Sequence, residues 1–190
     1  VSVHGAPIPF GDEDGLRAYR AGIGMQFQNI ALFDFLSVAD NVRFPLVAGG
    51  LSPDSPDVCR RVDEALVSVG LSAAADRRPS ELSGGMQRRV AIARAVVADA
   101  PILLFDDPTG GLDPVTSSRI FELIGRAGAR ADRTTIVASQ DIDRMVRHCA
   151  TFSVMDGGRV VFTGTPSEAG SCGLPGVRAL FEGVEAADGD

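Results

Sequence analysis

Lysine is absent from the 190 residues of this chain, so all eighteen basic side chains are arginines. Any site that depends on a lysine ammonium group is therefore excluded from this stretch of sequence. Tryptophan is also absent, and no apolar run is longer than four residues. Because a membrane-spanning helix needs about 20 apolar residues, we expect no transmembrane segment. Residues 1–14 have neither the basic start nor the apolar stretch of a secretory signal.

Cysteine and histidine are scarce. Cys59, Cys149 and Cys172 are far apart and odd in number, and only His4 and His148 could join them as metal ligands. This spacing argues against a disulfide framework and against a zinc site, and we expect reduced thiols in or near the core. The formal charge of −7 argues weakly against non-specific nucleic-acid binding.

The rest of the composition is that of an ordinary globular domain, with 45% apolar and 23% charged residues. A chain of this length buries roughly 70% of its unfolded surface, which favours one domain over 1–190. Strands alternate with helices in the second half, and this alternation predicts an α/β fold with a mostly parallel sheet. The expected strands are 23–28, 102–105 and 134–139, and the expected helices are 83–99, 114–130 and 141–148.

The stretch between the first two of these strands has a different pattern. Val58, Val62 and Leu66 recur at helical spacing and predict a helix over 57–69. We therefore expect a helical subdomain at 29–85.

The two ends of the chain are less regular. Residues 1–14 are expected to be irregular apart from a short strand at 1–3, because glycine and proline interrupt them. Asp156-Gly157-Gly158 predicts a β-hairpin turn between strands at 151–155 and 159–163. A tail at 164–190 is rich in small residues, with one apolar helical stretch near 177–181.

Ser83-Gly84-Gly85 at the start of a helix is the first candidate site. Ser83 can cap the helix, the glycines let an anion approach the backbone, and the free N–H groups favour negative charge. The tripeptide alone is equally compatible with an ordinary loop.

The second candidate is the pair Asp106-Asp107 after the apolar run Ile102–Phe105, which has the pattern of a strand buried on both faces. Carboxylates at the C-terminal edge of such a strand hold Mg²⁺ in NTPases. Adjacent residues of an extended chain point in opposite directions, so the two would have different roles. Apolar strands that end in aspartate are also common without any site.

Two further polar residues are ambiguous by themselves. Asp113 precedes Pro114 and is most simply a helix cap. Gln28 stands at the end of the expected strand 23–28, where a solitary glutamine is usually solvated.

In order and spacing, however, these features resemble the ATP-binding cassette (ABC) ATPases from about Ile23 to Phe162. Gln28 is similar to the glutamine of the Q-loop, and Leu82–Gln87 resembles the family signature. Ile102–Asp107 resembles the Walker B strand, and Gly111–Asp113 resembles the D-loop.

The resemblance implies a P-loop NTPase-like core, a helical subdomain that bears the signature, and ATP and Mg²⁺ as ligands. It implies a head-to-tail dimer in which each ATP lies between one subunit's Walker motifs and the other's signature. Asp106 and Gln28 would then hold Mg²⁺, partly through water, and Asp107 would orient the attacking water. The residues expected to contact ATP or its phosphates are Gln28, Ser83, Gly84, Gly85, Gln87 and Asp113.

A finer resemblance is to the ATPase subunit of Mla/Mce-type lipid transporters, carried by residues 24–34, 40–46, 107–117 and 175–183. It implies phospholipid transport, a lipid-binding partner protein and a peripheral position on the cytoplasmic face of the inner or plasma membrane. No nucleic-acid partner is implied. An integral-membrane permease would dock near an apolar cluster after the Q-loop, although this cluster could equally be core of the helical lobe. Its members are Phe33, Phe35 and Leu36.

The chain departs from the family at three places. It has no G-x-x-x-x-G-K-[ST], the loop whose backbone and lysine bind phosphates. We expect either that the chain is N-terminally truncated or that it is a natural pseudo-ATPase. Asp107 stands where the family has glutamate, and Gln140 stands at the switch-histidine position, where it cannot carry charge. Both replacements favour slow hydrolysis, or a non-hydrolysing subunit that acts as a nucleotide-gated or scaffold partner.

Overall fold

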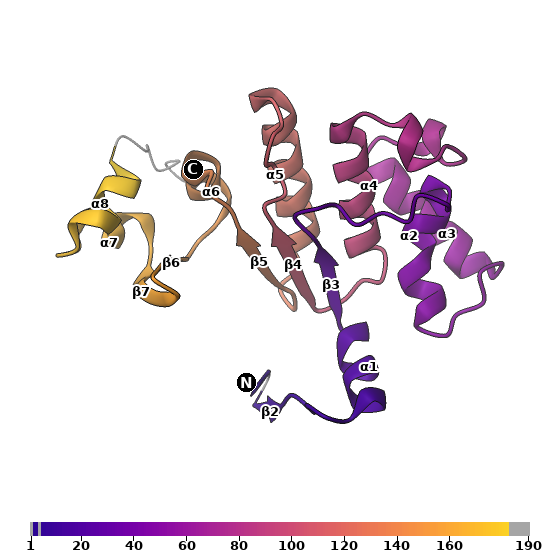
Figure 1. Ribbon diagram of the computed structural model, residues 1–190, viewed down its shortest axis with the longest axis horizontal. Helices are drawn as coiled ribbons and strands as arrows, with labels where there is room; N and C mark the ends of the chain where they lie inside the picture. The colour runs from indigo at the N-terminus through magenta and orange to yellow at the C-terminus, as the bar shows by residue number, and fades with distance from the viewer. Residues whose placement is uncertain (1, 4, 183–190) are drawn as a thin grey trace. The chain divides into compact units, whose positions relative to one another are not determined.

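The computed structural model describes residues 2–3 and 5–182 (Figure 1). The chain forms two compact units, Val1–Ala138 and Ser139–Asp190. The first unit contains a parallel sheet and a helical lobe, and the second contains a β-hairpin and short helices.

Three parallel strands form the sheet of the first unit, in the order β3–β4–β5. They are β3 (Ile23–Gln26), β4 (Ile102–Asp106) and β5 (Thr134–Ala138). The mostly parallel sheet expected from the sequence is confirmed. The expected strand 23–28 is two residues too long, however, so Gln28 lies in the loop beyond β3 and is exposed.

One face of this sheet packs against α4 (Gly84–Val96) and α5 (Pro114–Gly128), shown in Figure 1. Leu103 and Phe105 of β4 are buried against these helices, whereas the alternate residues of β4 are only half-buried. The prediction that this strand is buried on both faces is therefore wrong for the described residues. On the second face, Ile136 of the edge strand β5 is 56% exposed.

Gly24 sets how closely α4 approaches the sheet. A Cβ atom at this position would lie 2.8 Å from Leu103 Cδ2 and 3.0 Å from the carbonyl carbon of Ala95 in α4. Only glycine leaves room for the helix backbone here.

The helical lobe consists of α2 (Val38–Ala48), α3 (Pro56–Ser68) and two 3₁₀ turns (Ser72–Ala74 and Pro79–Glu81). Its helices pack on α4 through a continuous apolar core, as the periodicity of 57–69 predicts. Serine side chains begin both long helices: Ser37 accepts from the Asp40 amide, and Ser55 accepts from the Val58 amide. Buried residues of this core include Val42, Val58, Val62, Leu66 and Val90.

The N-terminal region is more ordered than expected. β1 (Ser2–Val3) pairs antiparallel with β2 (Ala6–Pro7), and α1 covers Glu13–Ala21. The irregular stretch predicted at 1–14 thus ends in a helix that the sequence pattern did not predict. No residue of α1 is buried, and the helix is short, with glycine at Gly15 and few large apolar side chains.

The second unit is built around the predicted hairpin. β6 (Phe152–Asp156) pairs with β7 (Arg159–Gly164) across Gly157 and Gly158, which both have positive φ. α6 (Ile142–His148), α7 (Pro166–Ser171) and α8 (Pro175–Phe181) accompany it, and α7 was not expected. Its core consists of Val146, Phe152, Ala169, Val177 and Phe181. Of the helices in the described part of the chain, none is both long and apolar enough to cross a membrane.

Candidate functional site

The candidate site begins at the carboxyl edge of the parallel sheet. Asp106 is the last residue of β4 and pairs in register with Ala138 of β5. The strand alternation places it on the half-buried face, together with Leu104. Gln28 follows β3 at the same edge, because parallel strands end on the same side. The structure therefore brings the loop of Gln28 and the carboxylate of Asp106 to one end of the sheet.

Asp107 has an unusual backbone conformation. Its φ is +43°, in the left-handed region that costs a non-glycine residue about 1–2 kcal/mol. The following residue is Pro108, which disfavours helical conformations of its predecessor further. The Asp107 amide donates to the Ala138 carbonyl oxygen at 2.8 Å, so the turn is tied directly to β5. Strain of this kind persists only where the surroundings hold it in place.

The signature segment forms the start of α4. The Ser83 hydroxyl caps the helix and accepts from the Met86 amide at 3.3 Å. Ser83 and Gly84 are exposed, and a Cβ at Gly85 would lie 3.3 Å from Thr116 Cγ2. This end of α4 therefore faces solvent while it packs on the start of α5.

Gln87 is already engaged inside the chain. Its side-chain amide donates to the Pro79 carbonyl at 2.9 Å and to the Leu82 carbonyl at 3.4 Å. These bonds tie the signature helix to the preceding 3₁₀ turn, and they use the donor that a phosphate contact would need.

Asp113 caps α5. Its carboxylate accepts from the Thr116 hydroxyl at 2.6 Å and from the amides of Thr116 and Val115 at 2.9 and 3.0 Å. The hydroxyl and amide of Thr116 lower the pKa of Asp113 below its usual value. The helix-cap interpretation is thus confirmed, and the same contacts favour the charged form of Asp113.

Two arginines of α4 bind the loops of the candidate site, and the sequence pattern predicted neither contact. Arg88 donates to the carbonyl oxygens of Asp107, at 3.0 Å, and Gly110. Arg94, only 7% exposed, donates to the carbonyl oxygens of Ile30 and Ala31 at 2.8 and 2.6 Å. Burial lowers the pKa of Arg94. No sequence pattern distinguishes these arginines from solvated ones, because their partners are backbone atoms.

The aromatic cluster after Gln28 is partly exposed. The ring of Phe33 lies 5.8 Å from that of Phe35 and 4.6 Å from that of Phe44. Phe35 is 74% exposed and Phe44 is 44% exposed. Fully buried Asn41 fixes the loop: its side-chain carbonyl accepts from the Phe33 amide at 2.8 Å, and its NH₂ group donates to the Phe33 carbonyl at 3.0 Å. The cluster is therefore more than core of the helical lobe, because one of its rings faces solvent.

Gln140 belongs to the second unit, two residues after the end of β5. It is exposed, and its carbonyl accepts from the Ile142 amide at 3.1 Å ahead of α6. The neighbouring Asp141 caps α6 through the Arg144 amide.

The residues of the sheet edge fit a magnesium ion only in part. Among the described residues, no group of three or more His, Cys, Asp or Glu side chains is placed to hold a metal. Mg²⁺ needs no such cage, because it binds through one or two carboxylates together with phosphates and water. Asp106 therefore fits this role, whereas a lysine for the phosphates is absent from the chain.

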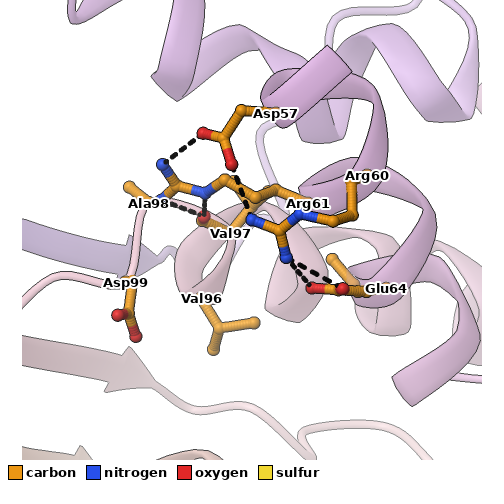
Figure 2. A pocket seen from close by; sticks show the side chains of 9 residues that line it. Asp57, Arg60, Arg61, Glu64, Val96, Val97, Ala98 and Asp99 are labelled. Atoms are coloured by element: carbon orange, nitrogen blue, oxygen red, sulfur yellow. Dashed lines mark hydrogen bonds and ion pairs between the residues drawn. The ribbon is translucent and has the colours of Figure 1, made fainter.

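A pocket of the described residues lies elsewhere. It has a volume of about 700 Å³ and lies between α3 and the C-terminal end of α4, the end remote from Ser83. Figure 2 shows that its charged side chains are already paired: Arg60 binds Asp57 and Glu64, and Arg61 binds the Val97 carbonyl. The pocket therefore offers no free charge to a ligand through these two arginines.

A parallel sheet with an aspartate at the end of its central strand, joined to a helical lobe and a Ser-Gly-Gly helix start, defines a P-loop NTPase fold of the ABC ATPase type. Residues 1–110 match the sequence profile of the ABC transporter family. The chain belongs to this family.

Known proteins support the assignment. The chain is 39% identical over 165 residues to "Methionine import ATP-binding protein MetN 2" of Pseudomonas aeruginosa, covering 86% of this chain and 49% of that protein. It is 40% identical over 162 residues to MetN of Xylella fastidiosa, covering 85% of this chain and 48% of that protein. The chain thus spans about half the length of the curated relatives it matches.

Solved structures show the same fold. CbiO1 of Clostridium perfringens, described as part of the ABC transporter complex cbiONQ, matches with a TM-score of 0.76 and 35% identity, over 88% of this chain and 66% of that chain. The dimeric bacterial ABC transporter cassette MJ0796 matches with a TM-score of 0.73 and 33% identity, over 81% of this chain and 67% of that chain. The individual residue roles in the site stay predictions.

Proposed function

We propose that this chain is part of an ATP-binding and ATP-hydrolysing subunit of an ABC transporter. One observation carries the proposal: the signature helix α4 begins against α5 and, through Arg88, binds the turn that bears Asp107. The two motifs that define the ABC ATPases are thereby held together in one unit. The family relationship supports ATP as the ligand, since the curated relatives are named ATP-binding proteins.

In this proposal the residues of the sheet edge act on a nucleotide. Asp106 would hold the magnesium ion, which when bound neutralises charge on the phosphates. Asp107 would orient the attacking water and accept its proton, a role that requires about 2.6–3.2 Å between the carboxylate and the water oxygen. Gln28 would contact the metal and the terminal phosphate from the loop after β3, and Gln140 would donate a hydrogen bond where the family has histidine.

A second ATPase subunit completes each site in a head-to-tail dimer. Ser83, Gly84 and Gly85 would contact the partner subunit's nucleotide, and the exposure of Ser83 and Gly84 supports this role. The MJ0796 cassette, which has the same fold and was solved as a dimer, is a precedent for such pairing.

A membrane permease is the second proposed partner, which would place the subunit peripherally on the cytoplasmic face of the membrane. Its docking surface is the cluster of Phe33, Phe35 and Leu36. Aromatic side chains are enriched at protein interfaces, and Phe35 offers an exposed one whose ring lies 5.8 Å from that of Phe33. Asn41 binds the backbone of Phe33 and so fixes this loop.

For the cargo, we propose phospholipid, delivered with a lipid-binding partner protein. The support is the resemblance of residues 24–34, 40–46 and 175–183 to Mla/Mce-type ATPases. Methionine import is a second candidate, because relatives at 39–40% identity are named methionine import proteins. The shared nucleotide motifs contribute to that identity but carry no information about cargo.

A non-hydrolysing subunit is the alternative activity, favoured by Asp107 and Gln140 at positions where the family has glutamate and histidine. The decisive experiment uses the full-length protein, purified with the permease that co-purifies with it and reconstituted in liposomes. ATP hydrolysis that is coupled to movement of a fluorescent phospholipid across the liposome membrane supports the lipid proposal. Hydrolysis stimulated by methionine uptake supports the second candidate, and ATP binding without any turnover supports the non-hydrolysing alternative.

A further inference from the structure

In the described part of the chain, the residues other than glycine that have a left-handed backbone share one feature. An arginine side chain donates hydrogen bonds to each of them. These residues are Ile30, Ala31, Asp99 and Asp107. Arg94 binds the carbonyls of the first two, Arg130 and Arg133 bind the Asp99 carboxylate, and Arg88 binds the Asp107 carbonyl.

We propose that Arg88 is a positioning residue for ATP hydrolysis, which fixes the carboxylate of Asp107 by clamping the turn Asp107–Gly110. This inference rests on the proposed function. Two nitrogens of the guanidinium group bind carbonyl oxygens at the two ends of the turn. The planar fork of arginine suits this bridge, and neither lysine nor an uncharged side chain can span it in the same way.

The clamp opposes a strained conformation. Asp107 combines a positive φ with a following proline, and each of these features disfavours the backbone conformation of a non-glycine residue. Among the described residues, the bond that the Asp107 carbonyl retains without Arg88 is a long one, 3.4 Å from the Gly110 amide. We therefore expect the turn to relax and the carboxylate to move with it.

Arg88 also connects two sites in the proposed dimer. It lies five residues after Ser83 on α4, about 7.5 Å along the helix axis. Because α4 is a continuous helix from the signature to this arginine, a contact of Ser83 with the partner subunit's nucleotide acts on the turn of Asp107 through one rigid element. The arginine thus links occupancy of one nucleotide site to the geometry of the other.

The test compares Arg88→Met with Arg61→Met in the full-length protein. Arg61 is a matched control, because it too is a half-buried arginine that donates to a backbone carbonyl, that of Val97, at the far end of α4 (Figure 2). We expect Arg88→Met to lower kcat roughly 10- to 100-fold with little change in the dissociation constant of ATP. The reason is that misplacement of a reacting group by about 1 Å can lower the rate about 100-fold. Arg61→Met should change stability but not kcat.

A further measurement separates positioning from general loss of stability. Hydrogen exchange of the amides in 107–112 should increase in Arg88→Met and stay unchanged in Arg61→Met. This readout needs no hydrolysis, so it tests the inference even if the parent protein proves inactive. If exchange in 107–112 is unchanged, or if both variants lower kcat in proportion to their melting temperatures, the inference is wrong.

Discussion

The backbone of Gly110 lies directly against the carboxylate of Asp107. A Cβ atom at Gly110 would lie 2.8 Å from Asp107 Cγ and 3.1 Å from Oδ1. The turn after β4 is therefore so tight that the Asp107 side chain, which is expected to orient water, contacts the backbone of Gly110. Any side chain at position 110 has to displace that carboxylate.

Gly110→Ala should lower kcat for ATP in the full-length protein by at least about tenfold, because the added methyl group pushes the Asp107 carboxylate out of place. ATP affinity should change little, since Asp106 carries the expected metal contact. Steady-state kinetics and a fluorescent-nucleotide titration measure the two effects. Gly170→Ala in α7 is the control: nothing lies within 4 Å of its Cβ position, and helix propensity favours alanine by up to about 1 kcal/mol. Unchanged kcat in Gly110→Ala would show that Asp107 is not the water-orienting group.

Asp107→Glu should raise kcat about tenfold, equivalent to roughly 1.4 kcal/mol of barrier. The longer side chain extends the carboxylate toward the position that it occupies in the family, where phosphoryl transfer depends on alignment of the water. Asp107→Asn should abolish turnover and leave nucleotide binding intact. If the asparagine variant hydrolyses ATP as fast as the parent, another residue orients the water.

Phe35→Ala should weaken association with the permease while changing the melting temperature by less than about 2 °C, because the ring is 74% exposed and its removal takes little apolar area out of the core. Co-purification from membranes and thermal unfolding measure the two quantities. Phe10→Ala removes an equally exposed ring, 71%, outside the cluster, and association should persist in that variant. Equal loss of permease in both variants would contradict a docking role for the cluster.

Gln26→Met should stabilise the fold by about 1 kcal/mol, which raises the melting temperature by roughly 2–4 °C. Gln26 is fully buried, and its Oε1 has no hydrogen-bond partner among the described residues. Methionine fills a similar volume and removes the unsatisfied oxygen. The substitution also removes the donor to the Phe27 carbonyl, but Phe27 is an exposed residue, so water can replace that donor. Gln26→Glu should do the opposite, because it buries a charge. A melting temperature that falls in Gln26→Met would indicate that Oε1 has a partner in solution.

The family, the parallel sheet and the residues of the motifs can be predicted from the amino-acid sequence. Ile102–Phe105 is a strand because its continuous apolar run has no helical period, and Ser83 and Asp113 cap helices because each stands immediately before one. These features depend on neighbours in the chain, so local patterns reveal them. Helix α1, in contrast, is nine residues long, contains a glycine and buries no residue, and the pattern did not predict it.

The contacts that hold the motif residues in place depend on how distant segments of the chain fold together. Arg88 and Arg94 bind carbonyl oxygens 19 to 64 positions away in the chain, and the side chains of those partners do not matter for the bond. The left-handed backbone of Asp107 and the contact of its carboxylate with Gly110 follow from the same folding of distant segments. A residue pattern records which side chains are present, whereas these contacts are made to the backbone, which is chemically the same at nearly every position.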